Sequence, residues 1–474
     1  MELDPLLLSR IQFAFCVSFH IIFPSFTIGL AAWLAILDGM AWRTGKAVYR
    51  RLFRFWLQIF GVSFALGAVS GIVLAFQFGT NWSVLADKGG AIQGPLLGYE
   101  AFTAFVLEAT FLGVVLVGRN KVPPWAYFFS CCMVALGTTC SAFWIMVNNT
   151  WMQIPVAYSE VGGRFVPVDW MEILFGGVVP IRIAHMLLAA YLTTAFCVAA
   201  TGAWYMLRTS YLHEARIMLK SGIVIAFVLV PVQMYFGHLS GEYTAVHQPS
   251  KFTAIEGRWE TQQPANLVLF AIPDEENERN YLEISVPKLG SLVDTGSTTS
   301  SEPGIKTIPR ELRPPLWAPF FGFRIMVGMG LIMLALAWAG AFVWWRKKLE
   351  TSDWFLWPMA WSFPVGFVAV ISGWFVAEIG RQPWVIFGKL KTVDALTPSL
   401  TGGQVLTTLI AYIVVYSLIF TGGTIFIFRL IRNGPAQISE TRDPVAVTSK
   451  RPIAVSGDAP GARLDATDGR GGGS

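Results

Sequence analysis

A few side chains that carry charge or can bind a metal ion lie inside long apolar stretches of this sequence. They are His20, Glu100, Glu108, His185, Arg324 and Glu378. If those stretches cross a membrane, each buried charge is costly, so such residues are functional candidates by default. Imidazole and carboxylate groups can coordinate a metal ion, whereas buried carboxylates at successive depths can pass protons.

Two of these residues, Glu100 and Glu108, stand eight residues apart in one apolar stretch. On an α-helix they fall about 80° apart, in the same quadrant at two depths. This arrangement favours a proton relay across the membrane. The alternative is a pair of structural carboxylates that are hydrogen-bonded to Ser, Thr or Trp.

The composition indicates that the surroundings of these residues are a membrane. Of the 474 residues, 54% are hydrophobic and only 14% are charged, whereas soluble domains carry roughly 25% charged residues. A soluble enzyme and a disordered protein are therefore both excluded. The net charge of +5 is small for this length, and we expect no nucleic-acid partner.

Nine stretches are long and apolar enough to cross the hydrocarbon core, which takes about 20 residues of helix. They cover residues 10–38, 55–79, 98–118, 125–148, 177–207, 219–240, 318–345, 357–379 and 402–429. The sequence therefore predicts an all-α polytopic membrane protein with about nine transmembrane helices.

Lys and Arg gather in alternate short loops, which the positive-inside rule assigns to the cytoplasm. These loops lie at residues 43–54, 119–121, 208–216 and 346–348. The N-terminus is therefore expected outside and the C-terminus in the cytoplasm. The expected external loops lie near residues 81–97, 149–176, 241–317 and 380–403.

The chain should accordingly divide into four parts. Residues 1–240 hold helices one to six, and residues 318–430 hold helices seven to nine. Residues 241–317 form a polar external loop of a length that is usually functional or disordered, in which 274–313 follows no pattern that we can interpret. Residues 431–474 read as a disordered cytoplasmic tail, and their final Gly-Gly-Gly-Ser is typical of a linker.

Four potential iron ligands converge on the external side of this topology. His20 lies in the outer half of the first span, His185 and Met326 in the outer parts of the fifth and seventh, and Glu378 at the outer end of the eighth. Imidazole with thioether gives six-coordinate iron suited to electron transfer, whereas a single ligand leaves a position for O₂. Haem is thus favoured over zinc, whose ligands would cluster. Alone, His20 would as readily be a core histidine, and Met326 would far more readily be a packing residue.

Blocks along nearly the whole chain resemble subunit I of the cytochrome bd-type quinol oxidases, the terminal oxidases of bacterial respiratory chains. They are GTNW at 79–82, GPLLGYE at 94–100, EATF at 108–111, SAFW at 141–144, NTWMQ at 149–153, QPSK at 248–251, WET at 259–261, FRIMVG at 323–328, GW at 373–374 and EIGRQPW at 378–384. The last block is the most specific. The short loop after Trp259 resembles the branch of cyanide-insensitive oxidases.

The resemblance implies three haems. His185 and Met326 match the axial pair of a low-spin haem b. His20 and Glu378 match the ligands of two high-spin haems, one b and one d, with a further haem b possible in place of d in this branch. Which residue serves which high-spin haem differs among members and is left open.

The resemblance also implies roles for other residues. Lys251 and Glu256 match quinol-site positions of the external loop. The matches to the proton path and dihaem site are Glu100, Glu108 and Ser141, and those to haem neighbours are Arg324, Trp374 and Arg381. For the arginines we expect pairing with haem propionates, because guanidinium binds carboxylates bidentately.

The implied activity is that of a quinol:O₂ oxidoreductase in the bacterial cytoplasmic (inner) membrane. Quinol, either ubiquinol or menaquinol, is oxidised outside, and O₂ is reduced to water with protons from the cytoplasm, so charge is separated without a pump. The implied partner is a second large membrane subunit, and the presence of a small single-span accessory subunit is left open.

Two other functions compete with this reading. One is a haem b subunit that relays quinone electrons to a partner without O₂ chemistry, which oxygen uptake with quinol would distinguish. The other is a transporter whose intramembrane charges line a substrate path. The sequence shows no inverted repeat and no matching pair of broken helices, which disfavours the transporter.

Overall fold

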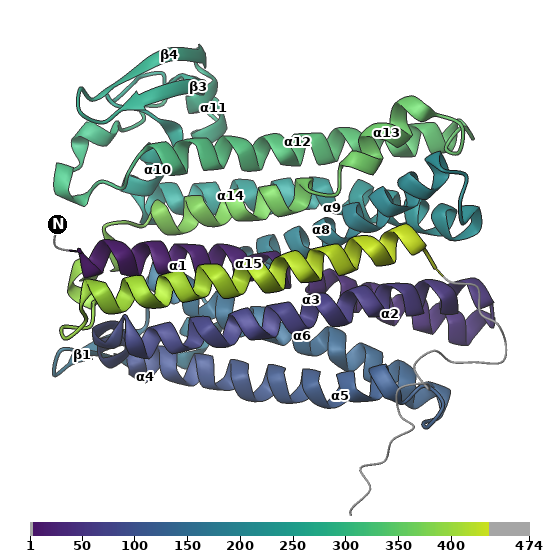
Figure 1. The fold of residues 1–474 in the computed structure, drawn as a ribbon. Helices are drawn as coiled ribbons and strands as arrows, with labels where there is room; N and C mark the ends of the chain where they lie inside the picture. The colour runs from purple at the N-terminus through teal and green to yellow at the C-terminus, as the bar shows by residue number, and fades with distance from the viewer. Residues whose placement is uncertain (1–2, 436–474) are drawn as a thin grey trace, which may run out of the picture. The chain divides into compact units, whose positions relative to one another are not determined.

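The computed structural model describes residues 3–435, so nearly all of the tail predicted from residue 431 lies outside the described part. Within that part, long helices make up most of the chain (Figure 1). They are α1 (Pro5–Ile22), α2 (Pro24–Thr44), α3 (Ala47–Thr80), α4 (Ser83–Tyr99), a π-helix (Glu100–Phe105), α5 (Val106–Val117), α6 (Pro124–Gln153), α8 (Val179–Leu207), α9 (Leu212–His247), α12 (Trp317–Trp345), α13 (Asp353–Trp361), α14 (Val365–Ile379) and α15 (Gly402–Asn433). Short connecting elements are β1 (Tyr158–Val161), β2 (Arg164–Pro167), α7 (Trp170–Phe175), β5 (Trp384–Ile386) and β6 (Leu390–Lys391).

The predicted helical membrane fold is confirmed in the described residues. Eight helical segments are long and apolar enough to cross a membrane, and α13 with α14, bent by 43° at a short break, makes a ninth. The first segment is itself interrupted, because α1 ends at Ile22 and α2 begins at Pro24. A proline ring fits the first turn of a helix but cannot continue a helix that precedes it.

The stretch predicted as the first external loop, residues 81–97, is instead largely helical, and this part of the prediction is wrong. Helix α4 runs through it and continues by the π-helix into α5. Its glycines and Pro95 make it a poor helix by propensity. Burial of Leu85, Ile92 and Leu96 in a core shared with α6 and β2 outweighs that preference.

Helices α8 and α9 pack closely against each other along glycine positions. A Cβ atom at Gly202 would lie 2.8 Å from the backbone nitrogen of Leu219, and one at Gly222 would lie 2.7 Å from the carbonyl oxygen of Ala195. Only glycine permits this approach, and small residues at helix contacts are typical of membrane proteins. The pair α8–α9 therefore forms a tightly fixed base for side chains on both helices.

The segment predicted as an external loop, residues 241–317, is folded. Helix α9 continues to His247, past the predicted end of its span. The elements that follow are α10 (Pro249–Glu256), β3 (Leu267–Asp274), β4 (Arg279–Val286), α11 (Leu289–Thr295) and two 3₁₀ turns (Ile305–Thr307 and Arg310–Leu312). Strands β3 and β4 pair antiparallel, and Figure 1 shows α10, β3, β4 and α11 together at one end of the helices.

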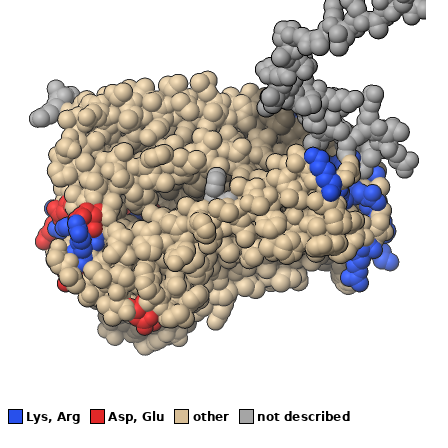
Figure 2. All heavy atoms as spheres, turned by 90° about the horizontal axis from the view of Figure 1, so that it is seen from below, with Lys and Arg blue, Asp and Glu red and all other residues tan. Residues whose placement is uncertain are grey.

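Charged side chains gather at the ends of the helices. On the face seen in Figure 2, only Lys and Arg stand at one end, whereas Asp and Glu accompany basic residues at the other and the surface between is uncharged. An uncharged belt is what contact with lipid requires. The basic end would face the cytoplasm under the positive-inside rule, and the orientation of the chain stays a prediction.

Candidate functional site

His185 on α8 packs against Gly237 of α9, a position that has no side chain. A Cβ atom at Gly237 would lie 3.3 Å from His185 Cε1, so a larger residue there would crowd the ring. His185 Nε2 is 3.4 Å from Nε2 of Gln233, one turn earlier on α9. Its Nδ1 is buried and has no hydrogen-bond partner among the described residues. The imidazole is therefore only weakly held by the protein's own polar groups.

His20 has a similar setting between α1 and α3. Its Nδ1 lies 3.0 Å from Ser70 Oγ, and a Cβ atom at Gly71 would lie 3.0 Å from its Cε1. A hydrogen bond at one ring nitrogen fixes the orientation of the ring and leaves the other nitrogen to act as a ligand. This geometry would make Nε2 the ligand atom of His20.

Met326 on α12 packs its sulfur against α14. A Cβ atom at Gly373 would lie 2.9 Å from Met326 Sδ, so the close contact depends on that glycine. The half-buried Trp374 follows Gly373, and Glu378 lies one turn further along α14. Three of the predicted site residues therefore lie on two helices in contact.

Glu378 is the centre of a partly buried polar network at the end of α14. Its Oε1 accepts hydrogen bonds from Asn149 Nδ2 at 2.8 Å and Gln153 Nε2 at 3.1 Å, both on α6. Its Oε2 pairs with Arg381, and Asn149 Oδ1 accepts from Arg182 of α8 at 2.6 Å. Arg381 is 5% exposed, yet its Nε and Nη1 have no partner in the described chain. The network thus holds two buried donors for a further acceptor.

Lys251 on α10 joins this network from residues 241–317, which are predicted to lie outside and are called the external segment below. Its Nζ donates to Gln153 Oε1 at 2.5 Å and to Gln248 Oε1 at 2.6 Å. Burial, and then the guanidinium groups of Arg182 and Arg381, lower the pKa of Lys251 well below its usual value. Burial therefore disfavours the charged form of this amine.

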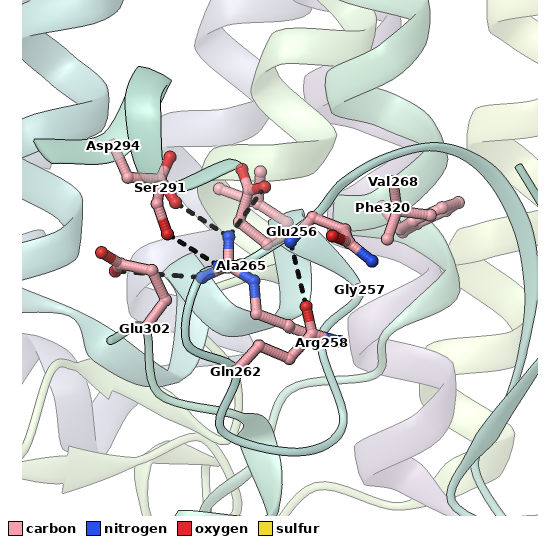
Figure 3. Close-up of polar contacts among 12 residues, drawn as sticks. Glu256, Gly257, Arg258, Gln262, Ala265, Val268, Ser291, Asp294, Glu302 and Phe320 are labelled. Carbon is pink, nitrogen blue, oxygen red and sulfur yellow. Dashed lines mark hydrogen bonds and ion pairs between the residues drawn. The ribbon is translucent and has the colours of Figure 1, made fainter. Parts of the chain in front are cut away.

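Glu256 ends α10 and faces a second cluster, shown in Figure 3. Its Oε2 lies 3.3 Å from Arg258 Nη2, and the same nitrogen lies 2.8 Å from Oδ2 of Asp294. Gly257, at a φ of 69°, takes the left-handed conformation that ends the helix and turns the chain at this point. Burial, and then the Asp294 carboxylate, raise the pKa of Glu256 to about 7. Glu256 is therefore suited to exchange protons near neutral pH.

Arg324, whose pairing with a haem propionate stays a prediction, directs donors to backbone carbonyl groups in the described chain. It donates to Ile255 at 2.7 Å and to Val268 at 2.5 Å, and its guanidinium lies 3.5 Å from the centroid of the Phe320 ring. These contacts join α10 and β3 to α12. Arg324 thus anchors the external segment, a role that its sequence context did not indicate.

Glu100 and Glu108 both face α6. Ser141 Oγ donates to Glu100 Oε1 at 3.0 Å, and a Cβ atom at Gly137, one turn earlier on α6, would lie 2.7 Å from Glu108 Cγ. Glu108 is 8% exposed. The two carboxyl groups therefore follow one face of α6 at successive turns, with Ser141 bound to one of them.

The structure gathers the predicted residues into separate groups. Lys251 and Glu378 share one network through Gln153, whereas Glu256 belongs to the second cluster. Gln153 lies in a matched sequence block but had no assigned role. Arg182 was also missed, although an arginine at the start of an apolar span is the kind of residue that the rule for intramembrane charges selects.

The described residues fit haem. A ring nitrogen of His185 and two donors of Arg381 are buried without partners in the described chain. Glycines at positions 71 and 237 keep space beside the two histidine rings. Imidazole and thioether are haem-iron ligands, and a guanidinium group can bind a propionate.

The fold and these side chains define a polytopic membrane protein with candidate haem ligands on four of its helices. Residues 8–435 match the model of the family Cytochrome bd terminal oxidase subunit I, and the chain belongs to this family. The predicted family is therefore confirmed. The chain is a transmembrane subunit of a terminal oxidase in electron transport, and membership of a cytochrome family implies haem cofactors.

Individual relatives extend over almost the whole chain. Cytochrome bd ubiquinol oxidase subunit 1 of Bacillus subtilis (strain 168) is 32% identical over 440 residues, which cover 91% of this chain and 93% of the relative. Cytochrome bd-II ubiquinol oxidase subunit 1 of Escherichia coli (strain K12) is 31% identical and covers 91% and 97%. The solved structure of the bd oxidase from Geobacillus thermodenitrificans has a TM-score of 0.83 at 28% identity and covers 91% and 99%.

Proposed function

We propose that this chain is the haem-containing subunit that oxidises quinol at the external face and reduces O₂ to water. Two relatives are named ubiquinol oxidase subunits, and the matched quinol-site positions Lys251 and Glu256 lie in the folded external segment. Protons from quinol leave outside, and protons for water come from the cytoplasm. The reaction therefore generates a proton gradient without a pump.

The observation that carries this proposal is the hydrogen-bonded connection between the external segment and α14. Lys251 donates to Gln153, which in turn donates to Glu378. A single side chain thus links a matched quinol-site residue to a matched haem ligand. A donor and an acceptor of electrons placed at these two residues would be close neighbours.

Haem, when bound, supplies one-electron transfer and an open iron position for O₂. His185 and Met326 would hold the low-spin haem b. His20 and Glu378 would hold the two high-spin haems, b and either d or a further b, with the order open. Arg381, which has two unpartnered donors in the described chain, would bind a propionate.

At the quinol end, the pKa values of Glu256 and Lys251 are shifted in opposite directions. Burial raises the pKa of Glu256 to about 7, so its carboxylate can take a hydroxyl proton from quinol as a general base. Burial lowers the pKa of Lys251, so its amine gives up a proton more readily than in water, and it can donate a hydrogen bond to a quinol oxygen. Together these residues orient quinol and remove its protons.

On the other side of the site, Glu108 and Glu100 form the inward proton path. They follow one face of α6, and Ser141 is hydrogen-bonded to the second of them. Buried carboxyl groups at successive depths suit stepwise proton transfer. Protons from the cytoplasm would pass Glu108 before Glu100 and Ser141.

The oxidase needs further components. We propose a second large membrane subunit as partner, because the relatives are named as subunit 1 of their oxidases. Quinol is either ubiquinol or menaquinol, the complex lies in the bacterial inner membrane, and a small single-span accessory subunit is left open.

The test is a reduced-minus-oxidised visible spectrum of the purified oxidase, repeated under carbon monoxide, together with O₂ uptake on addition of quinol. Bands of b-type haem, a far-red band that responds to carbon monoxide, and O₂ uptake are expected with haem d. Bands of b type alone that respond to carbon monoxide would place haem b at the third site. Low-spin b bands with no carbon monoxide response and no O₂ uptake would overturn the oxidase proposal in favour of an electron relay.

A further inference from the structure

We infer that Asp294 receives the proton that Glu256 takes from quinol and passes it toward the external surface at His238 and Glu242. The inference rests on the proposed function and adds an outlet to it. Asp294 acts through Glu256 rather than on quinol itself. It lies in residues 274–313, the part of the external segment whose sequence followed no recognisable pattern.

The cluster around Glu256 holds three carboxyl groups and one guanidinium group. The side chains of Arg258, Glu256, Asp294 and Glu302 are 1%, 6%, 6% and 8% exposed. If all were ionised, three negative charges against one positive would leave two negative charges uncompensated, which burial strongly opposes. At least one carboxyl group therefore holds a proton near neutral pH.

Arg258 brings two of these carboxyl groups together through one nitrogen atom. Its Nη2 lies 3.3 Å from Glu256 Oε2 and 2.8 Å from Asp294 Oδ2 (Figure 3). The shared cation offsets the repulsion between two carboxylates that would otherwise move apart. The pair can therefore exchange a proton while the cation keeps both groups in place.

Arg258 also has two nitrogen atoms that are buried without a hydrogen-bond partner in the described chain. Its Nε has no hydrogen-bond partner in the described chain, and its Nη1 reaches Glu302 Oε2 only at 3.9 Å. Glu302 Oε1 is likewise buried without a described partner. Ordered water normally satisfies buried groups of this kind, and such water would complete a proton path between the carboxyl groups.

The outlet from the cluster is on α9. Burial raises the pKa of Asp294, and Arg258 and then His238 oppose that rise. His238 Nε2 is 3.3 Å from Glu242 Oε1, and these two side chains are 50% and 52% exposed. A proton released from Asp294 toward α9 would reach solvent at this half-exposed pair.

Local hydrogen bonds fix the positions of Asp294 and Glu302, which lie far from Arg258 in the sequence. Ser291 on α11 accepts a hydrogen bond from the backbone nitrogen of Ala265 at 2.7 Å, which sets the position of Asp294 one turn later. Gln262 and Glu302 exchange backbone hydrogen bonds of 3.0 and 2.9 Å. The fold of this segment therefore holds the side chains of the cluster in position.

Each quinol has two hydroxyl protons to lose. Oxidation to quinone breaks two O–H bonds and releases two electrons, which the oxidase delivers to O₂, and two protons. The Glu256 carboxylate takes one proton and becomes a carboxylic acid. Transfer of that proton to Asp294 restores the carboxylate, which can then take the second.

The test is steady-state O₂ uptake with quinol by the complete oxidase carrying Asp294→Asn, measured between pH 5.5 and 8.5. An amide cannot hold the transferred proton, so kcat should fall by about tenfold or more at neutral pH while KM for quinol stays unchanged. The acidic limb of the profile should also move to lower pH, because Glu256 loses a neighbouring negative charge. The other charged groups that face this pair, Arg258, Glu302, Arg324 and His238, are unchanged.

Two matched variants separate a relay from a merely structural role. Asp294→Glu keeps a carboxyl group and should restore most of the activity. Glu311→Gln removes an exposed carboxylate of the same segment and should match the wild type. Wild-type kcat and an unshifted profile in D294N would overturn the inference alone, whereas absence of quinol-dependent O₂ uptake in the wild type would overturn the proposed function.

If D294N does not assemble with its haems, the surface end of the route is tested instead. His238→Gln changes a half-exposed side chain and should lower kcat by about threefold or more at unchanged KM and unchanged haem spectra. Full wild-type turnover in H238Q across the pH range would contradict the outlet.

Discussion

A carboxylate is a more effective general base at neutral pH when its pKa is raised toward that pH, and the pKa of Glu256 is raised in this way. Its pKa of about 7 follows from burial and from Asp294, which together outweigh Arg258 and Arg324. Below pH 7 the group is protonated and cannot accept a quinol proton. We therefore expect kcat/KM for quinol to fall by about tenfold per pH unit in the acidic range and to level off above neutrality.

The same residue gives a direct test of the quinol site. Glu256→Ala should abolish quinol oxidation, because the proposed base that takes the quinol proton is lost, while the haem spectra stay as in the wild type. The measurements are O₂ uptake and the reduced-minus-oxidised spectrum of the same preparation. Full turnover by this variant would remove Glu256 from the proposed mechanism.

Met326 allows a second test at a single atom. Met326→Leu replaces the thioether side chain by an aliphatic one of similar volume. The packing should therefore survive while one proposed iron ligand is lost. One low-spin haem should become high-spin in the visible spectrum. Met333→Leu, at another buried methionine of α12, is the control and should leave the spectrum unchanged. A low-spin signal that survives in M326L would refute the assignment.

The sequence could single out as candidates those residues whose side chains carry a large free-energy cost inside a membrane. His20, Glu108 and Glu378 stand out because nothing apolar explains them. Gln153 does not stand out, because an amide at the end of a span is common and its importance comes from what it touches. Its partners Lys251 and Glu378 lie on other elements, and only the fold brings them together.

At the scale of elements, the spaces beside the ligand residues are made by the neighbouring helix. Gly237→Leu should force His185 away from its position, because even a Cβ atom there would lie 3.3 Å from the ring. We expect loss of the low-spin haem spectrum, measured in the purified oxidase. Gly241→Leu, one turn further on α9 with nothing within 4 Å of its Cβ position, should keep the spectrum. Equal spectra in the two variants would contradict this role of the helix surface.

Helix periodicity predicted the spans well and their irregularities poorly. The angle between Glu100 and Glu108 assumed a regular α-helix, whereas residues Glu100–Phe105 form a π-helix that changes the rotation per residue. Both carboxyl groups nevertheless face α6. Helix α4 escaped prediction because its stability comes from packing against distant residues and not from its own propensity.

At the scale of the whole molecule, the orientation in the membrane follows from charge and can be tested. A green fluorescent protein fused after Asn433 should fluoresce, because the C-terminus is expected in the cytoplasm. Alkaline phosphatase inserted at Ser297, in the external segment, should be active. Activity of the phosphatase at Asn433 and not at Ser297 would invert the predicted topology.

The apolar pattern predicted the bundle, but not the external segment. Spans are recognisable because lipid imposes length and hydrophobicity on each helix separately. The external segment is held instead by pairing between positions such as Gln262 and Glu302, and by Arg324 reaching across from α12. Such contacts leave no periodic signal, and so the Arg258 cluster could not be seen in the sequence.

The bond between Gln153 and Glu378 also bears on how the protein is made. These residues are separated by 225 positions, so at about 5–20 residues per second the ribosome needs about 10–45 s to complete the pair. During that interval α6 is already synthesised while its partner on α14 does not exist. If Glu378 is a haem ligand as proposed, its site is complete only after α14 has been translated, and we expect cofactor loading after that point.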